Sequence, residues 1–149
     1  MEKVLHFDSP REVYTADACV ITCYDARFDL AYRKFLKRVG VAIYDHMKLP
    51  GGAKALAAPD RETDRDFALR MVRISLALHQ PKRAILIGHA DCGAYGGVPA
   101  EIVIADLARA AETLRAAGLP LTLETYFADF DGIYEAPGGA ANPERPALS

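Results

Sequence analysis

Two short, mostly apolar runs constrain the fold of this 149-residue chain more than any other feature of its sequence. The first covers residues 18–23 and is rich in β-branched side chains, and the second covers residues 83–88. Apolar runs of this length, followed at once by polar residues, are typical of strands buried inside a sheet. Both runs end in segments that carry cysteine or histidine. We therefore expect two buried strands that present chemically reactive side chains at their C-terminal ends.

Segments with helical spacing of apolar residues separate the expected strands. Helices are predicted at 29–39, 60–80 and 100–117, and further strands at 41–44 and 121–130. This alternation predicts one α/β domain whose central sheet has four or five mostly parallel strands flanked by helices. The expected core-facing positions of the three helices are Leu30, Phe35, Leu36 and Val39, then Phe67, Met71, Ile74 and Leu78, then Val103, Leu107, Ala110 and Leu114.

The ends of the chain differ in character from its centre. Residues 1–17 are mixed in composition and are expected to form an N-terminal arm, whereas residues 18–136 hold all the expected strands and helices. Residues 137–149 are rich in Pro, Gly and Ala, and we expect a disordered tail there.

Composition and charge exclude several classes of protein. The net charge of −2 gives no reason to expect nucleic acid or an anionic membrane as partner. The apolar stretches are far too short to span a bilayer, and the first residues are too polar for a signal peptide. Cys19, Cys23 and Cys92 are the only cysteines, which argues against a disulfide framework. We expect a cytoplasmic protein whose thiols are free for metal binding or catalysis.

Two motifs follow the buried strands. One is Cys23-Tyr24-Asp25-Ala26-Arg27 after the first run, and the other is His89-Ala90-Asp91-Cys92 after the second. Sites in open parallel sheets form beyond the carboxyl ends of the strands. If the two strands are neighbours, their ends lie about 5 Å apart, so that one ion can be reached from both.

The side chains in these motifs suit zinc. Cys23, His89 and Cys92 make a Cys₂His set that leaves one of four tetrahedral positions open, as in catalytic rather than structural zinc sites. We therefore predict one Zn²⁺ per chain, with water, Asp25 or Asp91 in the fourth position. In the alternative interpretation, Cys23 and Cys92 are buried core cysteines and His89 is a structural histidine.

Asp25 and Arg27 are expected to act beside the metal. Residues two apart in an extended segment share a face, so both would lie on the same side as Cys23. Two thiolates cancel the charge of Zn²⁺, which leaves the orientation of a bound hydroxide to other polar groups. Arg27 can hold Asp25 ionised, and Asp25 can then accept a hydrogen bond from that hydroxide. An ordinary ion pair at a strand end is the alternative.

At these motifs the chain resembles the β-class carbonic anhydrases. The segment from Ala84 to Gly93 is especially similar, and the likeness runs from about Ala18 to Gly132. The resemblance implies a β-carbonic-anhydrase-like fold, with Cys23, His89 and Cys92 as zinc ligands and Asp25 with Arg27 as catalytic dyad. It also implies reversible hydration of carbon dioxide to bicarbonate by a homodimer or higher homo-oligomer.

The chain also departs from the family pattern. Residues 47–52 keep a glycine turn but replace its usual polar residues, and the N-terminal helical arm of many members is largely missing. Other hypotheses are therefore a zinc hydrolase of carbon disulfide or carbonyl sulfide, a non-catalytic zinc-binding homologue, and a redox protein with a Cys23–Cys92 disulfide. Cys19 is expected in the core, Tyr95 in packing, and His46 is a possible proton shuttle.

Overall fold

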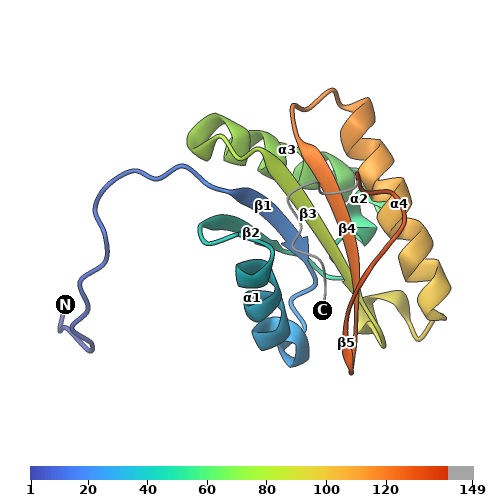
Figure 1. Ribbon diagram of the computed structural model, residues 1–149, viewed down its shortest axis with the longest axis horizontal. Coiled ribbons are helices and arrows are strands. Elements are labelled where there is room, and N and C mark those ends of the chain that lie inside the picture. The colour runs from blue at the N-terminus through green and yellow to red at the C-terminus, as the bar shows by residue number, and fades with distance from the viewer. Residues whose placement is uncertain (141–149) are drawn as a thin grey trace.

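The computed structural model describes residues 1–140, which form a five-stranded sheet with helices on both faces (Figure 1). The strand order is β2-β1-β3-β4-β5; the first four strands run parallel, and β5 is antiparallel to β4. The predicted α/β class with a mostly parallel sheet is therefore confirmed. The strands are β1 (Ala18–Thr22), β2 (Tyr44–Lys48), β3 (Arg83–His89), β4 (Thr122–Asp129) and β5 (Gly132–Glu135), and the helices are α1 (Asp29–Arg38), α2 (Lys54–Ala57), α3 (Glu62–His79) and α4 (Ala100–Ala116), with 3₁₀ turns η1 (Ala26–Phe28) and η2 (Gly93–Tyr95).

The sheet buries apolar side chains on both faces. Successive residues of a strand point to opposite faces, so Cys19 and Ile21 of β1 pack beneath α2, α3 and α4, whereas Val20 packs beneath α1. The central strands β1 and β3 are covered on both faces, which explains their nearly continuous apolar sequence. The predicted apolar face of α4 is confirmed, because Val103, Leu107, Ala110 and Leu114 are all buried.

Strand β2 lies later in the chain than the sequence predicted. The expected strand at 41–44 was wrong for most of its length, because contacts outside the sheet use the backbone N–H groups of residues 41–43. The N–H of Val41 donates to the Leu36 carbonyl at the end of α1. The Asp17 carboxylate accepts hydrogen bonds from the N–H groups of Ala42 and Ile43. The true strand is polar and sits at the sheet edge, paired only with β1. Its composition therefore carried no strand signal.

Helix α3 buries a different face from the predicted one. Phe67, Ile74 and Leu78 are 46%, 49% and 60% exposed, so the expectation that this stripe faces the core was wrong. The helix instead buries the smaller side chains of Ala68 and Val72. Ile74 and Leu78 of this stripe, together with Met71, line a groove between α3 and the edge strand β2.

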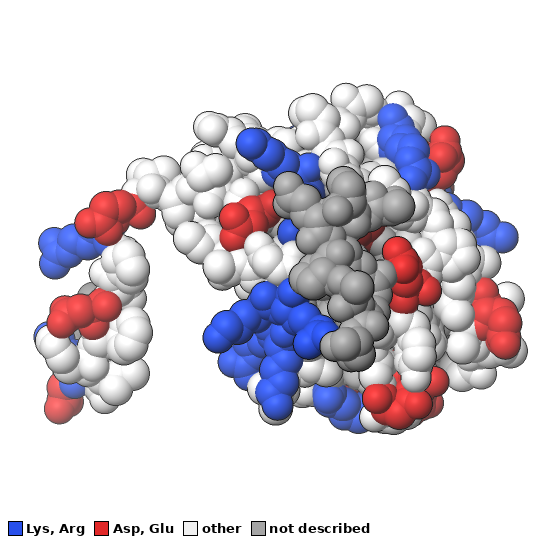
Figure 2. Space-filling model, viewed as in Figure 1, with Lys and Arg blue, Asp and Glu red and all other residues white. Residues whose placement is uncertain are grey.

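Helix α1 also buries an unexpected side chain. Leu30 is 56% exposed, whereas Tyr32 is fully buried together with Leu36. Lysine and arginine side chains gather over this helix (Figure 2), and two of them, Lys37 and Arg38, occupy its last turn. Cations at that position stabilise the negative end of the helix dipole. The polar face of α1 is therefore outward, and its aromatic side packs on the sheet.

The N-terminal arm extends away from the domain (Figure 1). It contains no helix or strand, and it joins the domain through Tyr14, whose ring stacks on His79 at 3.9 Å between centroids. At the other end, residues 137–140 run beside β4, where Ala140 N–H donates to the Leu123 carbonyl. The rest of the tail expected at 137–149 lies outside the described residues. Within residues 1–140, no helix is both long and apolar enough to cross a membrane.

Candidate metal centre

The two sequence motifs meet at one end of the sheet. Strands β1 and β3 are parallel neighbours with Thr22 opposite Ile87, so the segments that follow them leave the sheet side by side. The ligand atoms of Cys23, His89 and Cys92 all lie within 4.8 Å of one another. All three residues are buried. In the part of the chain that the structure describes, this is the only group of three or more such side chains close enough to share a metal ion.

The two cysteines of this group are free thiols. Their sulfur atoms lie 3.9 Å apart, well beyond the length of a disulfide bond. Cys19, the third cysteine, lies in the core under the helices, and burial raises its pKa to about 12. It takes no part in the site, as the sequence predicted.

The imidazole of His89 is oriented for a metal. Its Nδ1 lies 2.7 Å from the Ala90 carbonyl, so Nδ1 carries the proton and donates it to that oxygen. This tautomer leaves a lone pair on Nε2, which is buried and has no hydrogen-bond partner among residues 1–140. A buried acceptor without a partner destabilises a fold, whereas metal-binding histidines commonly show this arrangement of one nitrogen on a carbonyl and the other free for the ion. The residues present therefore fit a bound metal.

The Cys23 thiol ionises at lower pH than the Cys92 thiol. Burial acts to raise the pKa of Cys23, but the His89 ring in its protonated form and the backbone N–H groups of Gly51 and Asp25 outweigh it and bring this pKa to about 7. The tautomer with a free Nε2 is the form of His89 that a metal would bind. Burial also raises the pKa of Cys92, and there the N–H of Ala94 offsets it only in part. The Cys23 thiolate adds to that rise. A divalent cation between the two sulfurs would favour the thiolate form of both.

A glycine turn supports Cys23 from behind. Gly52 has φ of +56°, and a Cβ there would lie 2.9 Å from the backbone nitrogen of Cys23. Leu49 N–H donates to the Thr22 carbonyl, which fixes the turn against the end of β1. Only glycine permits both this backbone conformation and this close approach. The sequence signalled a glycine turn here, but not that Gly51 would direct its N–H at the Cys23 sulfur.

Asp25 and Arg27 form the contact that the sequence predicted. Arg27 donates from Nε and Nη2 to the Asp25 carboxylate, and these bonds lower the pKa of Asp25 to about 2. Asp25 also accepts the backbone N–H of Arg27, as the N-cap of η1. The remaining donors of Arg27 reach the carboxylate and the carbonyl of Asp91. Sequence reasoning missed this second partner, since the sequence indicated Asp91 only as a candidate fourth zinc ligand.

Other polar residues lie around the centre rather than in it. His46 contacts the Thr22 hydroxyl at 2.8 Å, and that hydroxyl donates to the Cys23 carbonyl. Burial lowers the pKa of His46. The Tyr95 hydroxyl donates to Asp106 on α4, and the Tyr95 ring packs against the core.

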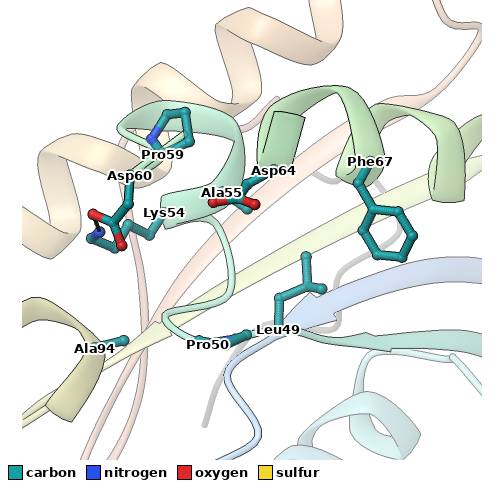
Figure 3. Close-up of a pocket in the computed structure, with 9 residues that line it drawn as sticks. All are labelled: Leu49, Pro50, Lys54, Ala55, Pro59, Asp60, Asp64, Phe67 and Ala94. Atoms are coloured by element: carbon teal, nitrogen blue, oxygen red, sulfur yellow. Dashed lines mark hydrogen bonds and ion pairs between the residues drawn. The ribbon is translucent and has the colours of Figure 1, made fainter. Parts of the chain in front are cut away.

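A cavity of about 320 Å³ lies beside the glycine turn that supports Cys23 and the loop that holds Cys92 (Figure 3). Pro50 of the glycine turn and Ala94, two residues after Cys92, both line it. Its apolar wall includes Leu49 and Phe67, so part of the exposed α3 stripe belongs to this hollow. Lys54 at its rim forms an ion pair with Asp60, at 2.6 Å from Nζ to the carboxylate.

The match to a protein family agrees with the geometry of the metal centre. The model of a family described as "Putative carbonic anhydrase" matches residues 14–135. No curated protein matches the chain significantly.

Several solved structures share the fold. A β-carbonic anhydrase from Trichomonas vaginalis superposes with a TM-score of 0.61 at 11% identity, covering 91% of this chain and 90% of that one. Tetrameric β-carbonic anhydrases from Sordaria macrospora give 0.59 at 15% identity, with 86% and 84% covered. A carbonic anhydrase from Streptococcus mutans gives 0.53 at 18% identity, with 88% of each chain covered. At these identities the likeness shows the fold alone.

Proposed function

Because the chain belongs to a carbonic anhydrase family, as its motifs predicted, we propose that it catalyses the reversible hydration of carbon dioxide to bicarbonate. The metal would be a zinc ion held by Cys23, His89 and Cys92. The observation that carries this proposal is the joint position of these ligand atoms, within 4.8 Å of one another, with a buried and unpartnered Nε2 among them. Two thiolates and an imidazole are a zinc set with one position open.

Zinc in this position would activate a water molecule as the nucleophile at near-neutral pH. The part of Asp25 follows from its pKa of about 2, because so weak a base does not take up a proton at neutral pH. Asp25 therefore acts as a fixed acceptor that orients the attacking water through one hydrogen bond. Arg27 holds the carboxylate in place and keeps it ionised, and Asp91 in turn holds Arg27.

We further propose that the protein works as a homodimer or higher homo-oligomer in the cytoplasm. The related β-carbonic anhydrases of Sordaria macrospora are tetrameric, which supports an assembly of identical chains. Three free cysteines, two of them ligands in this proposal, are compatible with a reducing compartment.

The test is metal content and carbon dioxide hydration measured on the same sample. One zinc per chain together with stopped-flow hydration between about pH 7 and 9 supports the proposal. Stoichiometric zinc without hydration would indicate a non-catalytic homologue. Release of sulfide from carbon disulfide or carbonyl sulfide, without hydration of carbon dioxide, would favour the hydrolase. Protein that binds no transition metal contradicts all three.

A further inference from the structure

Tyr32 places a hydroxyl group in the core without a partner. The side chain is fully buried, and its oxygen has no hydrogen bond to any residue from 1 to 140. Buried hydroxyls are nearly always paired, because an unpaired one loses its hydration and gains nothing in return. Of the described side chains, only two have a buried polar atom of this kind, and the other is His89. The free nitrogen of His89 belongs to the metal centre, so the position of the Tyr32 hydroxyl relative to that centre decides what it can bind.

The surroundings of Tyr32 link it to the same centre through one intervening aromatic ring. Its ring stacks on Phe28 at 6.1 Å between centroids, and Phe28 in turn packs on the ring of His89 at 4.6 Å. Burial raises the pKa of Tyr32, and the next contributions come from the charges of Cys23, Asp25 and Cys92, in that order. These residues act on the hydroxyl more strongly than Asp29, which lies one turn away on the same helix. The phenol therefore remains a neutral O–H donor facing acidic neighbours.

We propose that the Tyr32 hydroxyl donates a hydrogen bond to an oxygen atom of the bicarbonate, or of the water that precedes it, at the Cys23–His89–Cys92 centre. This inference rests on the proposed function and adds a third substrate-positioning residue to it. Asp25 can only accept a hydrogen bond, whereas a neutral tyrosine can donate one. An acceptor and a donor together suit a small oxygen species that carries both a proton and lone pairs, as water and bicarbonate do.

The alternative is a hydroxyl that is merely structural, paired with a buried water or with nothing. Tyr126 offers a matched comparison, because it is buried in the same apolar cluster beneath α1. Its hydroxyl donates to Glu124 at 2.9 Å and thus has a partner within the fold. Replacing each tyrosine with phenylalanine removes one buried hydroxyl and little else.

The experiment uses the protein loaded with Co²⁺, whose visible spectrum reports on anions that zinc would bind without a signal. Bicarbonate is titrated into the parent protein, Tyr32→Phe and Tyr126→Phe. We expect equal metal stoichiometry in all three and a bicarbonate Kd about tenfold higher in Tyr32→Phe only. Urea unfolding of the metal-free proteins is the second measurement. There Tyr32→Phe should be at least as stable as the parent, whereas Tyr126→Phe should unfold at lower urea.

Each other outcome contradicts a defined part of the proposal. A bicarbonate Kd for Tyr32→Phe within twofold of the parent value would show that the hydroxyl does not touch the ligand. A metal-free Tyr32→Phe protein as destabilised as Tyr126→Phe would show that the hydroxyl already has a partner in the fold. If the parent protein itself binds metal but shows no response to bicarbonate, the proposed function fails together with this inference.

Discussion

The guanidinium group of Arg27 donates hydrogen bonds to both oxygens of the Asp25 carboxylate. Arg27 Nη2 lies 2.7 Å from Asp25 Oδ2, and Nε lies 3.0 and 3.1 Å from Oδ1 and Oδ2. The Asp25 side chain is only 19% exposed, while that of Arg27 is 48% exposed and reaches on to Asp91. Such a charge-assisted fork fixes both the ionisation and the direction of the carboxylate. Asp25 is therefore already oriented before any substrate arrives.

From this relationship we expect Asp25→Asn to retain zinc but lose most of its activity. The amide is nearly the same size, yet it places an N–H₂ donor where only an acceptor can orient the attacking water. Hydration kcat should fall by about a hundredfold or more, with one zinc still bound per chain. Asp29→Asn is the matched control, because Asp29 pairs with Lys48 on the surface and should leave the rate nearly unchanged. Full activity in Asp25→Asn would remove the residue from the mechanism.

The sequence predicted those features of the fold and site that depend on short-range pattern. Continuous apolar runs identified β1 and β3, and the residues just after them identified Cys23, His89 and Cys92, because a strand fixes where its next side chains emerge. The polar edge strand β2 could not be found in this way, since a strand paired on one side needs no apolar signature.

Features that depend on tertiary packing could not be predicted from sequence. The spacing of Phe67, Ile74 and Leu78 gave a correct helix but the wrong buried face, because the side that packs is decided by how α3 docks on the rest of the fold. Likewise, nothing local to Gly51 indicates that its N–H meets the sulfur of a cysteine far away in the chain, and nothing local to Tyr32 indicates that its hydroxyl is buried without a partner in the described residues.

Removing one sulfur ligand should abolish tight metal binding. Cys92→Ala leaves two protein ligands, so zinc affinity should fall by more than about a hundredfold, the upper end of the loss caused by removing a group that only hydrogen-bonds to a ligand. Because metal binding stabilises the folded state, the variant should also lose the increase in melting temperature that zinc gives the parent protein. Competition with a chromophoric chelator measures the affinity. Cys19→Ala, which removes a buried thiol outside the site, should keep zinc affinity unchanged; equal losses in both variants would argue against Cys92 as a ligand.

Zinc binding should release protons, and more of them at lower pH. Burial holds the pKa of Cys92 above its ordinary value, so at pH 8 this thiol is protonated in the metal-free protein and the metal must displace about one proton. The pKa of Cys23 is about 7, and although burial acts to lower the pKa of His89, its contacts with Cys23 and the Ala90 carbonyl raise it, so as pH falls below 7 the metal must displace further protons from these two residues. Zinc affinity should therefore decline with falling pH, and more steeply below 7 than above. Calorimetry in buffers of different ionisation enthalpy counts the protons; heats independent of the buffer would contradict the thiolate assignment.

Gly52→Ala should damage the metal centre more than an equivalent change elsewhere. Both Gly52 and Gly96 have positive φ, +56° and +67°, so alanine at either position costs about 1–2 kcal/mol of stability from the backbone conformation alone. At Gly96 a new Cβ meets open space, whereas at Gly52 it would press on the backbone at Thr22 and Cys23. We therefore expect urea unfolding to show a loss of stability at least about 1 kcal/mol larger for Gly52→Ala. Zinc affinity should fall only in that variant, because the displaced turn carries the Gly51 N–H away from the Cys23 sulfur. Equal stability and equal zinc affinity in the two variants would show that the glycine turn does not support the site.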